Sequence, residues 1–259
     1  MKKNRFFLYA LSLVVALGMT ACGGSDDDGG GGEAPLPEKT VSLSSSDFVE
    51  GKGYFDGSLY YSVTSEDNKE VEVKEADKEI TAAVIPHKVS IDGVEYSVTR
   101  IGDTAFGSCK QLVSVTIPES VTEIKENAFV ACESLTSIVI PKGVTKIERN
   151  TFAQCIALES VTIPEGVTEI GLGAFQKCSS LTSITLPASL ETLVGYSFMN
   201  CSSLADIHCK GTTPPISVNG YPFSNTNIVN LYIPKGCKDA YQEKNPWKSL
   251  WDSVNVIEE

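Results

Sequence analysis

The chain has 259 residues, 33 of them acidic and 21 basic, so its formal net charge is −12. A surface this acidic repels nucleic acid and anionic membrane faces, which argues against binding to DNA or RNA. The apolar fraction of 42% is typical of a folded protein, whereas two histidines supply little of the usual acid–base and metal chemistry.

The amino-terminal segment, residues 1–21, has the composition of a secretory signal peptide. Basic residues precede an apolar run at residues 6–17, which is too short to span a bilayer comfortably. Small residues then precede Cys22, and this sequence resembles the lipobox of bacterial lipoproteins. The resemblance implies that Cys22 is acylated and anchors the mature chain by lipid instead of a membrane-spanning helix. The alternative is an ordinary cleaved signal peptide followed by an incidental cysteine.

Residues 22–39 form a predicted linker rich in glycine and aspartate. Glycine runs stay flexible and neighbouring acids repel one another, so this segment has nothing to bury. A serine and three acids follow soon after the cysteine: Ser25, Asp26, Asp27 and Asp28. They resemble the surface-export signal of Bacteroides-type lipoproteins, which implies a location on the outer membrane, exposed at the cell surface. The alternative is a solvated spacer.

Residues 40–97 contain two hairpin signals. Asp-Gly pairs at residues 56–57 and 92–93 are each flanked by β-forming apolar residues, a pattern typical of tight β-turns. The second pair lies in an insertion within the first of the repeat units that follow. We predict a small β-rich cap over residues 40–97 that covers the amino-terminal end of those units.

Residues 98–210 repeat with a period of 23. Leucine, phenylalanine and cysteine each recur at this interval. The phenylalanines are Phe106, Phe129, Phe152, Phe175 and Phe198. A fixed period of this length is the signature of a solenoid, in which each unit buries its apolar face against its neighbours.

The sequence pattern within a single unit predicts two extended segments and one turn. Polar and apolar residues alternate over residues 112–117, as in a half-buried strand, and Pro118 ends it because proline has no N–H to donate. A shorter extended segment around Ile124 follows, and then a helical turn that places Phe129 and Cys132 inside. Stacked units place equivalent positions about 4.8 Å apart. The predicted fold class is therefore an α/β solenoid with a parallel sheet on one side and short helical turns on another.

The unit pattern L-x-x-V-x-I-P-x-x-V-x-x-I-x-x-x-A-F-x-x-C closely resembles the BspA-type leucine-rich repeats of bacterial surface proteins. The resemblance covers residues 40–259. It implies a right-handed leucine-rich repeat superhelix, with adhesion or other protein binding in some members. Many members have no known ligand, so the resemblance says more about fold than about function.

Residues 211–259 are predicted to form a carboxyl-terminal cap. Six aromatic residues gather there: Tyr221, Phe223, Tyr232, Tyr241, Trp247 and Trp251. A cap must cover the apolar side of the last repeat, so we expect these residues to form its core. The alternative is an aromatic patch that binds a glycan or a protein.

The cysteines beyond Cys22 are expected to be mostly free thiols. Five of them share one inward repeat position: Cys109, Cys132, Cys155, Cys178 and Cys201. A buried cysteine behaves as a small apolar residue, so this set needs no bonding. Cys209 and Cys237 pair with each other or stay free, a choice that the spacing leaves open. The absence of CxxC argues against a zinc ribbon or a dithiol redox centre.

The sequence gives little support for a catalytic function. His208 and Cys209 are neighbours on a predicted strand, so their side chains point to opposite faces and do not form a nucleophile–base pair. His87 stands alone beside the inserted hairpin. We predict no enzymatic activity, no cofactor and no metal site. Short motifs at Thr104 and Ser253 resemble a bacterial O-glycosylation signal, and their modification stays open.

The expected function is that of a non-enzymatic cell-surface lipoprotein. Its solenoid would bind an extracellular protein, of the host or of bacteria, and only its lipid would touch the membrane. The candidate interaction face is the outward side of the parallel sheet: Ser114, Thr116, Ser137, Val139, Ser160, Thr162, Ser183 and Thr185. These residues lack the aromatic and arginine anchors of binding hot spots, which indicates weak or multivalent binding or a different face. The alternative is a structural or accessory subunit of an outer-membrane assembly such as a nutrient-uptake complex.

Overall fold

A computed structural model of the chain describes residues 40–259. The predicted signal peptide, the lipidation site Cys22 and the linker with Ser25 and residues 26–28 lie outside the described residues and stay predictions. In the described part of the chain, no helix combines the length and the apolar character needed to cross a membrane.

The amino-terminal cap is a mostly antiparallel sheet. Its strands are β1 (Thr40–Leu43), β2 (Phe48–Val49), β3 (Gly53–Phe55), β4 (Leu59–Ser65), β5 (Glu70–Ala76), β7 (Lys88–Ile91) and β8 (Val94–Ile101), in the order β1-β7-β8-β5-β4-β3-β2. A 3-10 turn, Ser45–Asp47, joins β1 to β2. Both predicted hairpins are confirmed, as β3–β4 and β7–β8. Asp92 and Gly93 have φ angles of 48° and 82°, which the tight turn between β7 and β8 requires.

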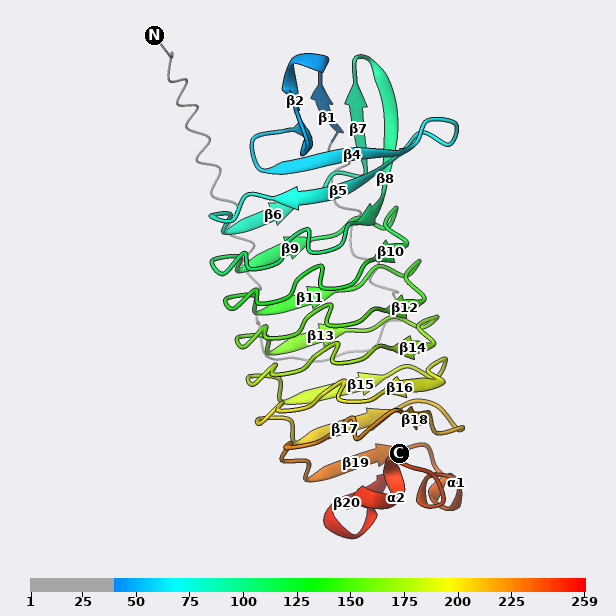
Figure 1. Ribbon diagram of the computed structural model, residues 1–259. Helices are drawn as coiled ribbons and strands as arrows, with labels where there is room; N and C mark the ends of the chain where they lie inside the picture. The colour runs from blue at the N-terminus through cyan, green and yellow to red at the C-terminus, as the bar shows by residue number, and fades with distance from the viewer. Residues whose placement is uncertain (1–39) are drawn as a thin grey trace, which may run out of the picture. The chain divides into compact units, whose positions relative to one another are not determined.

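Two rows of parallel strands build the solenoid (Figure 1). The first row is β6 (Ala82–Val84), β9 (Ser114–Thr116), β11 (Ser137–Val139), β13 (Ser160–Thr162), β15 (Ser183–Leu186), β17 (Asp206–Cys209), β19 (Asn230–Ile233) and β20 (Asn255–Glu258). The second row continues from β8 and is β10 (Glu123–Ile124), β12 (Lys146–Ile147), β14 (Glu169–Ile170), β16 (Thr192–Val194) and β18 (Ile216–Val218). Ser137 lies beside Ser160, and Lys146 beside Glu169, so the 23-residue unit is confirmed.

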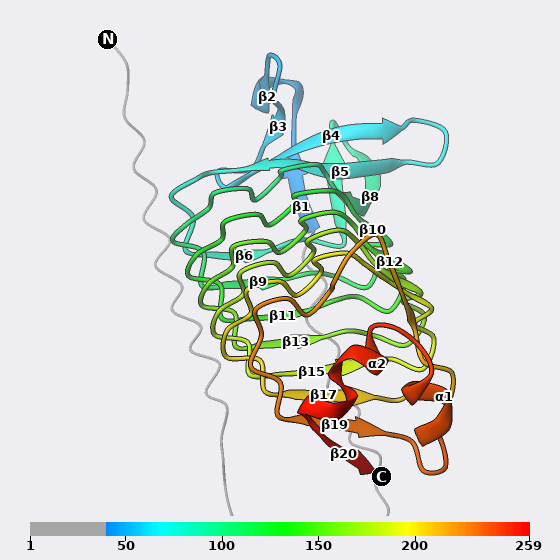
Figure 2. The ribbon, with the colours of Figure 1, turned by 60° about the horizontal axis from the view of Figure 1, so that its bottom comes forward.

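The solenoid extends beyond residues 98–210 at both ends. At its start, β6 already pairs in parallel with β9, and at its end β18 and β19 continue the two rows. The rows continue because Leu231 and Ile233 repeat the inward alternation of the earlier strands and are buried. The carboxyl-terminal end is then closed by α1 (Lys238–Gln242), α2 (Trp247–Leu250) and a 3-10 turn (Trp251–Ser253), which leads into β20 (Figure 2).

The second row is followed in each unit by a series of tight turns, and no α-helix occurs in the described residues before α1. Each unit contains two residues in the left-handed region, such as Asn127 and Ala131, both with φ of 57°. A left-handed residue stops a helix from continuing. The turns hydrogen-bond from unit to unit instead: the amide of Phe129 donates to the carbonyl of Thr151 at 2.9 Å.

A stack of phenylalanine rings runs through the core and is here called the phenylalanine spine. Its members are the five predicted phenylalanines and Phe223. Neighbouring ring centroids lie 4.9–5.5 Å apart, and the rings are nearly parallel. Trp247 ends the spine, 5.7 Å from Phe223, and its indole N–H donates to the carbonyl of Pro215 at 2.8 Å.

The aromatic residues of the carboxyl-terminal segment therefore divide into two groups. Trp247, Tyr241 and Phe223 are buried, and Trp251 is partly buried against the core, as the prediction of a cap core requires. Tyr221 is exposed, and Tyr232 lies half-buried on the outward side of β19, so for these two the prediction is wrong. Both belong to the last solenoid turn, whose outward positions face solvent.

The five repeated cysteines form a second buried column of free thiols. The Cys155 thiol donates to the carbonyl of Phe129, and the Cys178 thiol to the carbonyl of Phe152, each at 3.2 Å. Burial raises the pKa of Cys178 well above its usual range and that of Cys209 to about 12. Cys209 and Cys237 are free thiols as well.

We expect Cys237 alone to react rapidly with a thiol reagent such as DTNB at pH 8 in the folded Cys22→Ser variant. Burial raises the pKa of Cys109 to about 11, which leaves thiolate, the reactive form, at on the order of one part in a thousand at pH 8. Cys237 is partly exposed. Unfolding in guanidinium should release all seven remaining thiols. If two fewer thiols than this reacted after unfolding, a disulfide would be present.

Candidate functional site

The outward side of the first row of strands, here called the strand face, contains all eight predicted interaction residues. They occupy β9, β11, β13 and β15 and are exposed or half-buried, while the residues between them point inward. Ser137 pairs with Ser160, and Val139 with Thr162, so the side chains form two columns along the solenoid. The predicted grouping on one face is therefore present. Nothing among these eight residues supplies a charge or an aromatic ring.

The same two columns continue over the last three strands of the row, where their chemistry changes. The first column becomes Asp206, Asn230 and Asn255 in register. The Asn230 amide donates to the Asp206 carboxylate at 2.7 Å, and the Asn255 amide donates to Asn230 at 3.1 Å. Directed side-chain hydrogen bonds of this kind fix the orientation of each amide.

The second column ends in an aromatic pair. The rings of His208 and Tyr232 are stacked, with centroids 4.1 Å apart and planes 5° apart, and Ile257 is the next residue in register. The Nδ1 atom of His208 lies 3.3 Å from a carboxylate oxygen of Glu259. The strand face thus presents small, neutral side chains on β9, β11, β13 and β15. At its carboxyl-terminal end it presents aromatic rings and charged groups. The alternation of Tyr232 with Leu231 and Ile233 is the sequence signal that could have placed it there.

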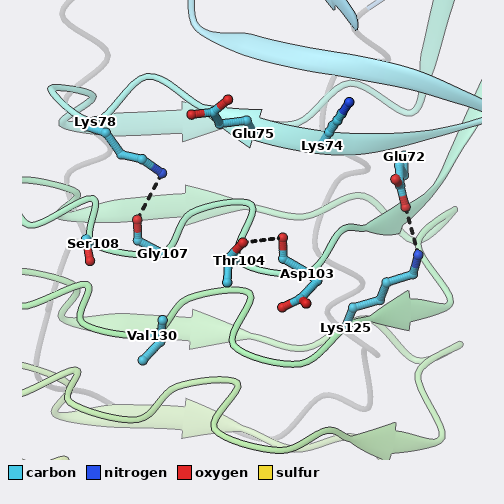
Figure 3. Close-up of a pocket in the computed structure, with 10 residues that line it drawn as sticks. All are labelled: Glu72, Lys74, Glu75, Lys78, Asp103, Thr104, Gly107, Ser108, Lys125 and Val130. Carbon is cyan, nitrogen blue, oxygen red and sulfur yellow. Dashed lines mark hydrogen bonds and ion pairs between the residues drawn. The ribbon is translucent and has the colours of Figure 1, made fainter. Parts of the chain in front are cut away.

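A separate pocket of about 480 Å³ lies where the cap meets the first turns (Figure 3). Its six charged side chains all have polar partners among the described residues. Lys125 donates to Glu72 at 3.0 Å, Lys78 donates to the carbonyl of Gly107 at 3.0 Å, and the Thr104 hydroxyl donates to the carbonyl of its own neighbour at 2.7 Å. No histidine or cysteine lines the pocket. It offers neither a nucleophile–base pair nor a concentration of one charge.

The geometry of the described residues does not support the hypothesis of a catalytic or a metal-binding site. Cys209 is buried and His208 lies on the opposite side of the same strand, as the alternation predicts. Within residues 40–259, no three His, Cys, Asp or Glu side chains come together as metal ligands would. His87 is half-buried and lies between β6 of the solenoid and β7 of the cap.

Comparison with known proteins agrees with this architecture. A family model described as the BspA type leucine rich repeat region matches in six copies, over residues 88–205 and 122–244. A leucine-rich repeat protein from T. pallidum has a TM-score of 0.55 and 22% identity, covering 80% of this chain and 100% of that one, which supports the fold. No curated protein matches the sequence.

Two further solved structures are similar in sequence. A leucine-rich repeat protein from Bacteroides ovatus is 28% identical over 70% of this chain, with a TM-score of 0.44, and this chain spans 59% of its length. A protein described as a leucine rich cell surface protein, from Faecalibacterium prausnitzii, is 25% identical, with 70% of each chain covered and a TM-score of 0.43.

Proposed function

Because the chain belongs to the BspA-type leucine-rich repeat family, we propose that it is a non-enzymatic binding protein whose strand face contacts an extracellular protein. The observation that carries the proposal is the change of chemistry along that face. Its first strands present small side chains that pack closely against a partner without adding specific energy. The last three strands add stacked rings and a hydrogen-bonded amide column.

The carboxyl-terminal end of the strand face has the composition of a binding hot spot. Tyrosine is enriched among the residues that contribute most to protein interfaces, and aromatic anchors work best when already held in place. Tyr232 is held by its stacking on His208, which in turn contacts Glu259. Little side-chain entropy is lost on binding such a preordered pair. The small neighbouring residues would then exclude water around it.

The test is capture of a partner by the purified protein from host secretions and, separately, from the envelope of the producing cells. We expect Tyr232→Ala to weaken capture about thirtyfold or more, because losing a hot-spot side chain costs about 2 kcal/mol or more. Thr162→Ala, on the same face, should change affinity little. Thermal melting of both variants serves as the folding control.

Two outcomes would redirect the proposal. Unchanged capture by both Tyr232→Ala and a folded triple variant with lysine at Ser137, Ser160 and Ser183 would remove the strand face as the site. Capture only from the producer's own envelope would favour the role of an accessory subunit in a surface assembly.

The proposed location follows from the sequence before residue 40. Acylation of Cys22 would tether the protein to the outer membrane, and the acids at residues 26–28 would direct it to the cell surface. We expect Cys22→Ser to shift the protein to soluble fractions, which immunoblotting of fractionated cells measures. Alanine at residues 26–28 should keep the protein in the membrane but shield it from protease added to intact cells. Undiminished surface digestion of that variant would reduce the acids to a spacer.

A further inference from the structure

A stretch one solenoid turn long, which begins after β17 and includes β18 and β19, has no charged side chain. Residues 211–234 contain no Asp, Glu, Lys, Arg or His, in a chain in which 21% of residues are charged. Lys210 and Lys235 stand immediately outside this run. Asn, Ser, Thr and Tyr supply its polar groups instead. Because recognition of a charged ligand relies on complementary charge, a surface of this composition suits a neutral ligand.

Two tyrosines occupy one corner of the molecule, after β16 and after β18. Tyr196 and Tyr221 each stand two residues before a member of the phenylalanine spine, where two earlier units have Asn127 and Asn150. Their side chains are 41% and 71% exposed. Gly220 has a φ of 136°, and a Cβ atom there would lie 3.3 Å from the Tyr196 ring. The glycine therefore leaves room for that ring to lie beside the backbone that leads into Tyr221.

A small pocket adjoins Tyr221 and has an uncharged lining. Its volume is about 220 Å³, and the rings and side chains of Tyr221, Pro222, Pro246 and Leu250 line it together with two serines. Ser224 and Ser249 donate their hydroxyl protons to backbone carbonyls at 3.1 and 2.6 Å. Their oxygen lone pairs are left to accept hydrogen bonds. The Tyr221 hydroxyl bonds to no other residue in the described chain and can both donate and accept.

We propose that this corner binds a neutral saccharide, with one sugar ring stacked on Tyr221 and its hydroxyl groups bonded to the serines and the tyrosine hydroxyl. A pyranose ring has an apolar C–H face and hydroxyls that donate and accept, which matches the apolar ring and the mixed polar groups here. The pocket is smaller than the roughly 300–1,000 Å³ of sites for drug-sized ligands. It suits a single ring, at the end or along a chain.

Affinity electrophoresis tests the proposal, with the full-length Cys22→Ser variant run in gels that contain starch, galactomannan or xyloglucan, all neutral, or the anionic polymer alginate. We expect retardation in at least one neutral gel and none in alginate. Tyr221→Ala should weaken the retarding affinity at least tenfold, whereas Tyr221→Phe should retain most of it because the ring face remains. Tyr221 is largely exposed, so the alanine variant should melt within a degree or two of the parent.

The matched control is Tyr232→Ala, on the strand face, which should leave the retardation unchanged. Conversely, Tyr221→Ala should leave protein capture by the strand face intact, so the two sites fail or succeed separately. Normal mobility in every neutral gel would overturn the proposal, as would retardation that survives in folded Tyr221→Ala. Tyr221-dependent binding of poly-L-proline in place of any polysaccharide would likewise overturn it and assign the corner to a peptide.

Discussion

Phe152→Ala is expected to lower the free energy of unfolding by about 3–5 kcal/mol. Phe152 is fully buried, and its ring lies 5.4 Å from that of Phe129 and 5.3 Å from that of Phe175. The backbone on both sides is held by hydrogen bonds between units, so the structure cannot collapse into the vacated space. The free-energy costs of the cavity and of the lost contacts therefore add together. Equilibrium denaturation in urea, followed by circular dichroism, measures the change.

Ile156→Ala provides the matched control for this prediction. Ile156 belongs to the same unit but is 46% exposed, and substitutions at exposed positions usually change stability by about 0.5 kcal/mol or less. If the two variants unfolded at the same urea concentration, the continuous phenylalanine spine would be wrong.

Trp247→Ala should have an effect of similar size, about 3–5 kcal/mol, but confined to one end of the molecule. Trp247 is fully buried against Phe223 and Tyr241. Its loss would uncover the end of the spine and leave the carbonyl of Pro215 without its indole donor. In a solenoid each turn contacts only its neighbours, so the disturbance should spread inward gradually.

Hydrogen exchange followed by mass spectrometry distinguishes a local from a global effect of Trp247→Ala. Amides in β18 and β19 should exchange faster in the variant, and those in β11 and β13 should keep their protection. Trp251→Ala, a change at a partly exposed neighbour, should have a much smaller effect. Uniformly faster exchange along the whole chain would contradict the prediction that Trp247 stabilises only the carboxyl-terminal end of the solenoid.

The interior of this fold could be predicted from single residues at a fixed interval. Parallel stacking gives every equivalent position the same surroundings, so one residue type suits them all. Phe152 and Cys155 were assigned to the core on this basis, and both are fully buried. The thiol-to-carbonyl hydrogen bonds of the cysteine column could not be predicted, because they depend on backbone geometry between units.

The conformation of the turns escaped prediction because it is imposed from outside each unit. Ala131 has a φ of 57°, which alanine seldom adopts and which no local propensity indicates. Its amide donates to the carbonyl of Ala153 in the next unit, at 2.8 Å. A contact between residues so far apart in sequence determines the local backbone, and a short window of sequence does not contain it.

The 23-residue period alone does not place Tyr232, because its position depends on where that regular period ends. Asp206 pairs with Asn230 and Asn230 with Asn255, so the spacing lengthens beyond 23 residues while the strands continue. A search for a strict period stops at residue 210 and assigns everything after it to a cap. A tyrosine in a cap is expected inside, whereas the same tyrosine on one further strand faces solvent.

The direction of the hydrogen bonds between turns has a mechanical consequence. These bonds run along the solenoid axis, since they join each strand to the next one in its row. For a protein tethered at its amino-terminal end and bound to a partner near its carboxyl-terminal end, tension would act along the same axis and peel the bonds apart a few at a time. Turns would then detach singly, each releasing up to about 80 Å of chain. Such a molecule would yield stepwise under load, one turn at a time.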